Sequence, residues 1–177
     1  MAGDLVHGDN MKEQKTNKTE DAAGIVGKIR VITYKAGTKE IKRKTEWIKN
    51  LIVVGSDTGK NLILKRLAGV NTYTLNITHA DIGTGQNPPS SSDTTLQTPV
   101  ARGTIGGYYF SGNNIVTLQF FFSDALLPNG TYYEFGTFID GTGTVSTGRL
   151  FNRALFGTPY TKSSGEDTTV EVQIEIN

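Results

Sequence analysis

The stretch NLIVVGSDTGKN, residues 50–61, holds glycines and a lysine of the kind found in phosphate-binding loops. Such a loop needs the spacing G-x-x-x-x-G-K-[ST], so that backbone amides surround the phosphates and a hydroxyl binds magnesium. Here three residues separate Gly55 from Gly59, and Asn61 stands where the hydroxyl residue should follow Lys60. The stretch therefore predicts a strand, a turn and a helix in place of a nucleotide site.

The downstream carboxylates are spread over separate segments, and no motif joins two of them into an acid–base pair for sugar hydrolysis. They are Asp81, Asp93, Asp124, Glu134 and Asp140. His79 shares a strand face with Asp81, but the serines of PSSSDTT suit local turns better than a catalytic triad. Because the chain has no cysteine, thiol catalysis, disulfides and cysteine-ligated zinc are excluded. We expect no enzyme, no catalytic residue, no cofactor and no metal.

Glu134 stands in the aromatic stretch TYYEFG. A strand glutamate among apolar neighbours is more often paired with an arginine than catalytic. The candidate partners are Arg102, Arg149 and Arg153, and we predict a structural ion pair between Arg102 and Glu134.

A basic segment, Lys28–Lys49, holds eight Lys/Arg and two Glu. Its charge would suit nucleic-acid phosphates, but no recognition helix or base-stacking motif accompanies it. We therefore favour an acidic surface on a partner subunit over nucleic acid. The charged anchors of this contact are predicted to be Lys42, Arg43 and Lys44.

The remaining elements follow from periodicity. Alternation in KIRVITYK, a turn at Gly37 and the returning IKRKTEWI predict a basic β-hairpin over residues 25–49. Residues 56–69 predict one short helix. Its expected cap is Ser56 or Asp57, and its expected apolar stripe is Ile63, Leu64, Leu67 and Ala68.

After the helix the pattern predicts strands with glycine turns. The loop Gly83–Thr95 is expected on the surface, where it forms an interface through Pro88, Pro89 and Asp93. In the last strand, valines and isoleucines alternate with Glu171, Gln173 and Glu175, which predicts a buried face and an acidic, solvated face. The fold class is mainly all-β: an antiparallel β-sandwich or jelly-roll-like domain over 25–177, with one short helix and an extended polar N-terminal arm over 1–24.

Composition and charge limit the possible domain number, membrane association and partners of the chain. The 177 residues suffice for one domain. Apolar runs such as Leu51–Val54 fall far short of the ~20 residues of a membrane helix, and the opening residues lack the apolar core of a signal peptide. Through Val70 the chain has 14 Lys/Arg against 8 Asp/Glu, a balance of +6, and from Asn71 it has 4 against 9, a balance of −5. This opposition, and an arm with little apolar content, favour contact between subunits, with Asp4–Asp21 lying against a neighbour.

Several short motifs follow one another from Asn50 onward. They are NLIVVG, KNLILKRLAG, DIGTGQNPPSSSDTTL, Arg102, YEFGTF, GRLFNRALF and the closing alternating strand. In this order and spacing the chain resembles a family of small virion proteins of tailed phages and prophages, described as tail, baseplate or fibre proteins. Residues 1–49 lie outside the resemblance.

The resemblance implies a non-enzymatic building block of a virion, assembled in the host cytoplasm as a symmetric homo-oligomer. Its partners would be copies of itself and other virion proteins, with no membrane contact. Two alternatives stay open: a capsid decoration (cement) protein held by its arm, and a receptor-binding module for host-surface glycans. The glycan reading would use the aromatic side chains Tyr108, Tyr109, Tyr132 and Tyr133 as stacking surfaces.

Overall fold

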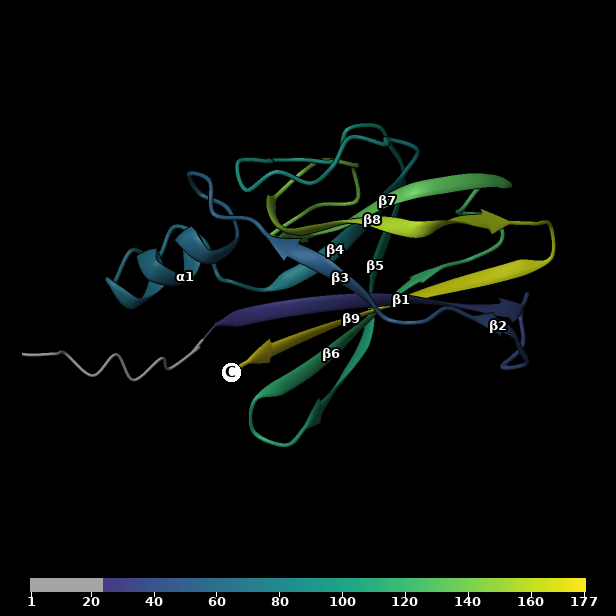
Figure 1. The fold of residues 1–177 in the computed structure, drawn as a ribbon, viewed down its shortest axis with the longest axis horizontal. Helices are drawn as coiled ribbons and strands as arrows, with labels where there is room; N and C mark the ends of the chain where they lie inside the picture. Colours follow the sequence, from purple (N-terminus) through teal and green to yellow (C-terminus); the bar gives the residue numbers. More distant parts are fainter. Residues whose placement is uncertain (1–23) are drawn as a thin grey trace, which may run out of the picture.

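The computed structural model describes residues 24–177, so the predicted arm and its contacts over Asp4–Asp21 lie outside the described residues, apart from Gly24. The described part forms nine strands and one helix (Figure 1). In chain order these are β1 (Ile25–Lys35), β2 (Ile41–Lys44), β3 (Ile48–Ile52), α1 (Gly59–Leu67), β4 (Ile77–Gly83), β5 (Pro99–Ser111), β6 (Ile115–Phe122), β7 (Gly130–Ile139), β8 (Arg149–Lys162) and β9 (Glu166–Ile176).

Eight strands close into one antiparallel barrel in the order β1-β3-β8-β7-β4-β5-β6-β9. Closure comes from β9, which pairs with β6 on one side and with β1 on the other, from Ile25 opposite Ile176 to Lys35 opposite Glu166. The short strand β2 lies outside this barrel order and pairs antiparallel with β1 at Ile32–Tyr34, which makes a hairpin. The all-β prediction is confirmed. The pairing gives one closed sheet and does not confirm the two separate sheets of a sandwich.

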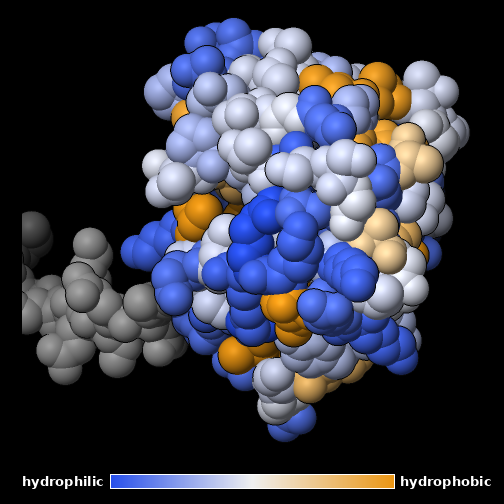
Figure 2. Space-filling model, turned by 90° about the vertical axis from the view of Figure 1, so that its right-hand side faces the viewer, coloured by the Kyte–Doolittle hydropathy of each residue, from blue (hydrophilic) through white to orange (hydrophobic). Residues whose placement is uncertain are grey.

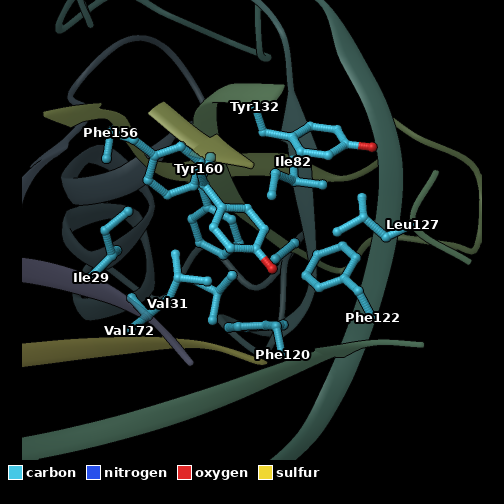
Figure 3. Packing of buried hydrophobic residues seen from close by; sticks show 14 of the residues in the cluster. Ile29, Val31, Ile82, Phe120, Phe122, Leu127, Tyr132, Phe156, Tyr160 and Val172 are labelled. Atoms are coloured by element: carbon cyan, nitrogen blue, oxygen red, sulfur yellow. The ribbon is translucent and has the colours of Figure 1, made fainter. Parts of the chain in front are cut away.

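Apolar side chains fill the barrel, as they do in other eight-stranded barrels of this width. Phe120 and Phe135 meet edge to face across the interior, and Tyr132 stacks on Tyr160 with ring centroids 6.4 Å apart. Figure 3 shows Tyr160 directed toward Val31 and Phe120, with Phe122 and Leu127 beside them. The interior is a core of buried apolar side chains.

The face of β9 predicted to be acidic and solvated is partly buried. Val170 and Val172 point into the core as predicted, but Glu171 is only 3% exposed. Its carboxylate accepts hydrogen bonds from Arg30 at 2.5 Å and from Gln119 at 2.9 Å. Neighbouring strands on both sides of β9 supply these long polar side chains, so the glutamate is covered on the outer face of the barrel.

Two apolar clusters lie outside this core. At one end of the barrel, Leu62 of α1 packs on Ile52, Ile139 and Phe151. Over the wall formed by β7 and β8, Leu96 of the long loop 84–98 packs on Val53, Phe138 and Leu150. The loops above β7 and β8 in Figure 1 are thus attached to the barrel by apolar contacts as well as polar ones.

The helix is shorter than predicted and is turned differently. Thr58 is the N-cap residue, so the predicted cap at Ser56 or Asp57 is wrong. Of the predicted stripe only Ile63 packs against the barrel. Leu64 is 63% and Leu67 is 81% exposed, Ala68 is exposed, and the buried leucine is Leu62, so the rest of the stripe is wrong. Contact between the first turn and the barrel sets this rotation. Within residues 24–177, no helix is long and apolar enough to cross a membrane.

Candidate functional site

The backbone amides of the turn between β3 and α1 donate hydrogen bonds to other groups of the same chain. The amide of Lys60 donates to the carbonyl of Val53 at 2.9 Å, and the amide of Gly55 donates to the carbonyl of Ser91 at 3.0 Å. The amide of Asp57 donates to the side chain of Asn61 at 3.1 Å. A phosphate cradle needs such amides free and convergent. The predicted strand, turn and helix are confirmed.

The predicted ion pair between Arg102 and Glu134 is wrong, because strand register gives each residue another partner. Arg102 lies directly opposite Asp81 in the β4–β5 ladder, and its Nε donates to the Asp81 carboxylate at 2.5 Å. Glu134 lies beside β8, where the Nη2 of Arg153 donates to it at 2.8 Å. Arg153 was one of the three candidate partners of Glu134.

Glu134 fastens both ends of the loop 84–98. Its carboxylate accepts backbone hydrogen bonds from Gly85 at 3.0 Å, Gln97 at 3.0 Å and Thr98 at 2.6 Å. A Cβ on Gly85 would lie 2.3 Å from Oε1 of Glu134, so the loop can approach this carboxylate only with a glycine there. The acceptor is fully buried and fully used, which suits a structural clamp.

Arg153 extends the same clamp to the middle of the loop. Its guanidinium donates to Asp93 at 2.7 Å and to the carbonyl of Asn87 at 3.0 Å. Asp93, predicted as a partner contact, is therefore engaged inside the chain. Pro88 is exposed and Pro89 is half-buried, so the tip of the loop remains at the surface as predicted.

A second clamp holds the loop 140–148. Arg102 donates to the carbonyls of Thr142 at 2.9 Å and Thr147 at 3.0 Å, while its partner Asp81 accepts from the amide of Ser146 at 2.8 Å. His79 lies next to this cluster, and burial together with the nearby Arg102 charge lowers its pKa. His79 bonds to neighbouring Thr78, and no described serine completes a triad with it.

The basic hairpin is paired with the acidic part of its own chain. Lys42 and Arg43 both donate to Glu166 at 2.7 Å, and Arg43 also lies over the ring of Tyr160. The hydrogen bond from Arg43 is the main reason that the pKa of Glu166 falls to about 2. Lys44 is exposed and forms no ion pair with a described residue. Figure 2 shows this end of the molecule, where hydrophilic residues dominate and apolar ones are scattered.

The end of the barrel opposite the basic hairpin carries an apolar cleft that was not predicted from the sequence. The cleft has a volume of about 640 Å³ and lies between α1, the start of β4, the second half of β5, the first half of β6, the start of β8 and the end of β9. Its twelve lining residues include no charged one. Tyr108 and Phe110 at its rim are 65% and 68% exposed and meet edge to face. Only the run of uncharged residues in IGGYYFS could have signalled it.

The aromatic residues considered for glycan binding fall into two groups. Tyr132 is a core residue and Tyr133 is half-buried, whereas Tyr108 and Tyr109 are exposed. The described residues contain no group of three or more His, Asp or Glu side chains that could hold a metal ion. Comparison with protein-family models, curated proteins and solved structures found no match to this chain.

Proposed function

We propose that this protein is a non-enzymatic structural subunit that assembles with copies of itself in the tail, baseplate or fibre of a tailed phage. The phage setting rests on the ordered motifs from Asn50 onward. Assembly with other copies is supported by the distribution of exposed apolar residues.

The observation that carries the proposal is that the most exposed large hydrophobic residues lie at one end. Of the large hydrophobic residues in the described part, five are at least 60% exposed, and they lie on α1, on β5 and at the end of β9: Leu64, Leu67, Tyr108, Phe110 and Ile176. Tyr108 and Phe110 line the cleft, and α1 lines it through Ile63. A gathered apolar surface of this kind marks a contact with another macromolecule more often than a free surface.

The state of the buried acids supports a structural role. Each buried carboxylate accepts hydrogen bonds from an arginine, a lysine or backbone amides: Asp81, Glu134, Glu166, Asp167 and Glu171. A general acid or base must exchange a proton with a substrate, so it needs access and a suitable pKa. Carboxylates clamped in this way hold loops and neighbouring strands in place.

Glycan binding is the second candidate, because Tyr108 and Tyr109 are exposed. Sugar hydroxyls need polar partners, however, and the cleft beside Tyr108 offers only the side chains of Asn76 and Thr78 besides the tyrosine hydroxyl. A glycan array probed with the purified protein would favour this candidate if a Tyr108→Ala variant lost a signal that the unchanged protein gave.

The phage setting is tested on particles. Phage particles induced from the bacterium that encodes the chain are purified, analysed by peptide mass spectrometry and labelled with gold-coupled antibody. We expect peptides of this chain and label at the tail or baseplate. Label spread over the head would favour the decoration alternative, and particles without the chain would refute the virion role.

A further inference from the structure

Strand β5 extends beyond its neighbour β4. The β4–β5 ladder runs only as far as Thr104, opposite His79, whereas β6 pairs with β5 as far as Ser111. From Ile105 to Ser111, one edge of β5 therefore faces no strand. Residues 105–111 pair with β6 alone, and among the described residues no turn, loop or side-chain hydrogen bond reaches them; we call their unpaired side the β5 free edge.

The β5 free edge lacks the features that normally protect an edge strand. Proteins place charges, prolines or covering segments on such edges, because unpaired amides and carbonyls are a template for another strand. IGGYYFS contains neither a charge nor a proline. The other edge strand, β2, has the sequence IKRK and is protected by its three cations.

The apolar cleft lies beside this edge. One wall consists of Tyr108 and Phe110 from the edge itself, and the other includes Ile63 of α1, Leu75 and Ile77. Leu75 has a φ of +68°, in the left-handed region that non-glycine residues seldom adopt. The next residue back, Thr74, is held by the carboxylate of Asp140, which accepts from its amide at 2.7 Å. The wall is thus fixed in a strained backbone conformation beside an open edge.

We propose that the β5 free edge pairs with the same edge of a second copy, antiparallel across a two-fold axis. This inference rests on the self-assembly part of the proposed function and names the contact. Identical edges related by a two-fold axis run antiparallel, so each supplies the partner that the other needs.

Three features point to a second copy. In self-pairing, residues near the axis face themselves or close neighbours, and an edge without charge brings no like charges together. The cleft is likewise uncharged. It can therefore face the same uncharged surface of a second copy. The exposed side chains of Tyr108 and Phe110 line the cleft and would be covered in the dimer.

The absence of cysteine allows a direct test by crosslinking. Each residue from Ile105 to Ser111 is replaced singly by cysteine, and disulfide-linked dimer is measured after mild oxidation. Directly opposed Cβ atoms are about 4.5–5.5 Å apart in an antiparallel pair, near the separation that a disulfide needs. We expect dimer yield to peak at one or two neighbouring positions. Ser163→Cys, in the exposed turn at the other end of the barrel, is the control and should give only background.

A second pair of variants tests the contact without crosslinking. A Cβ on Gly106 would meet its nearest neighbours at 3.8 Å, so Gly106→Lys adds a charge to the edge without a clash. Gly157→Lys on β8, where a Cβ meets nothing within 4 Å, is the matched control. We expect Gly106→Lys to weaken self-association at least tenfold in sedimentation equilibrium and Gly157→Lys to leave it unchanged.

The possible results distinguish failure of the β5 contact from failure of self-assembly. An oligomer that is unaffected by Gly106→Lys, with crosslinking at 105–111 no higher than at Ser163→Cys, would overturn the β5 contact and leave self-assembly standing. Loss of the oligomer only when residues 1–23 are removed, with no effect of Gly106→Lys, would assign the contact to that segment instead. A monomer at every concentration would overturn both the contact and self-assembly.

Discussion

At the scale of single residues, buried arginines decide how the loops are held. Arg153 joins Glu134, Asp93 and a loop carbonyl, and Arg102 joins Asp81 and two carbonyls of the loop 140–148. The sequence suggested that Glu134 is paired with an arginine, but it could not select the arginine. Strand register makes that choice, and register depends on contacts between segments far apart in the chain.

Arg153→Met tests the clamp on the loop 84–98. The change leaves Glu134 and Asp93 without their arginine, and breaking a buried pair in this way costs roughly 3–5 kcal/mol. We therefore expect the free energy of unfolding in urea to fall by about 3 kcal/mol, because the amides bonded to Glu134 retain part of its stabilisation. Arg66→Met, on the exposed side of α1, is the control and should change it by less than about 0.5 kcal/mol. Equal effects of the two changes would contradict the clamp.

Glu166 gives a prediction for acid. Its pKa is about 2 in the folded protein, below the ordinary value of 4.5, so its ionised form favours the folded state. This contribution is complete above the ordinary pKa and is lost as the pH falls from about 4.5 toward 2. Unfolding free energies of the wild type and of Glu166→Gln, measured across pH 2–7, should differ most above pH 4.5 and converge as the pH falls toward 2. A constant difference across the whole range would show that Glu166 does not contribute in this way.

At the scale of elements, alternation in the sequence predicted the strands well. The first and last strands have strongly alternating sequences, and both form where they were expected. Their pairing with each other, which closes the barrel, could not be read from the sequence because each pattern specifies only a buried and an exposed face. The face of α1 was also mispredicted. Two turns of helix carry apolar residues on several sides, and contact with the barrel selects Leu62.

Glycines test how closely α1 is attached to the barrel. Gly59 has a φ of +38°, and a Cβ there would lie 2.0 Å from the carbonyl oxygen of Val53. Gly69, just past the helix, has a φ of +80° with nothing within 4 Å. Gly69→Ala should therefore cost only the left-handed conformation, about 1 kcal/mol. Gly59→Ala adds a backbone clash and should cost more than about 2 kcal/mol in the same denaturation assay. The close attachment would be contradicted if the two variants were equally stable.

At the scale of the whole molecule, the opposite charges of the two parts of the chain meet within one subunit. Lys42 and Arg43 bind Glu166, and Arg30 binds Glu171. The basic hairpin therefore has less free charge for a neighbour than its composition suggested. The five most exposed large hydrophobic residues lie at the other end, so an apolar contact there fits the structure better than a purely ionic one.

Lys44 allows a clean test of the remaining basic surface. It is exposed and outside the Glu166 cluster, so Lys44→Glu should leave the unfolding free energy within about 0.5 kcal/mol of wild type. If the hairpin binds an acidic partner surface, the same change should weaken that contact and reduce its dependence on salt. Pull-down from purified particles at low and high salt measures this. Unchanged binding would remove Lys44 from the predicted contact set.

The central claim, that this chain is a self-assembling structural subunit, is tested most directly by its mass in solution. Sedimentation equilibrium of the full chain across a wide concentration range compares the measured mass with the 19.2 kDa of one copy. We predict an integral multiple of this mass that falls toward a single copy on dilution. A mass of 19.2 kDa at every concentration would contradict self-assembly.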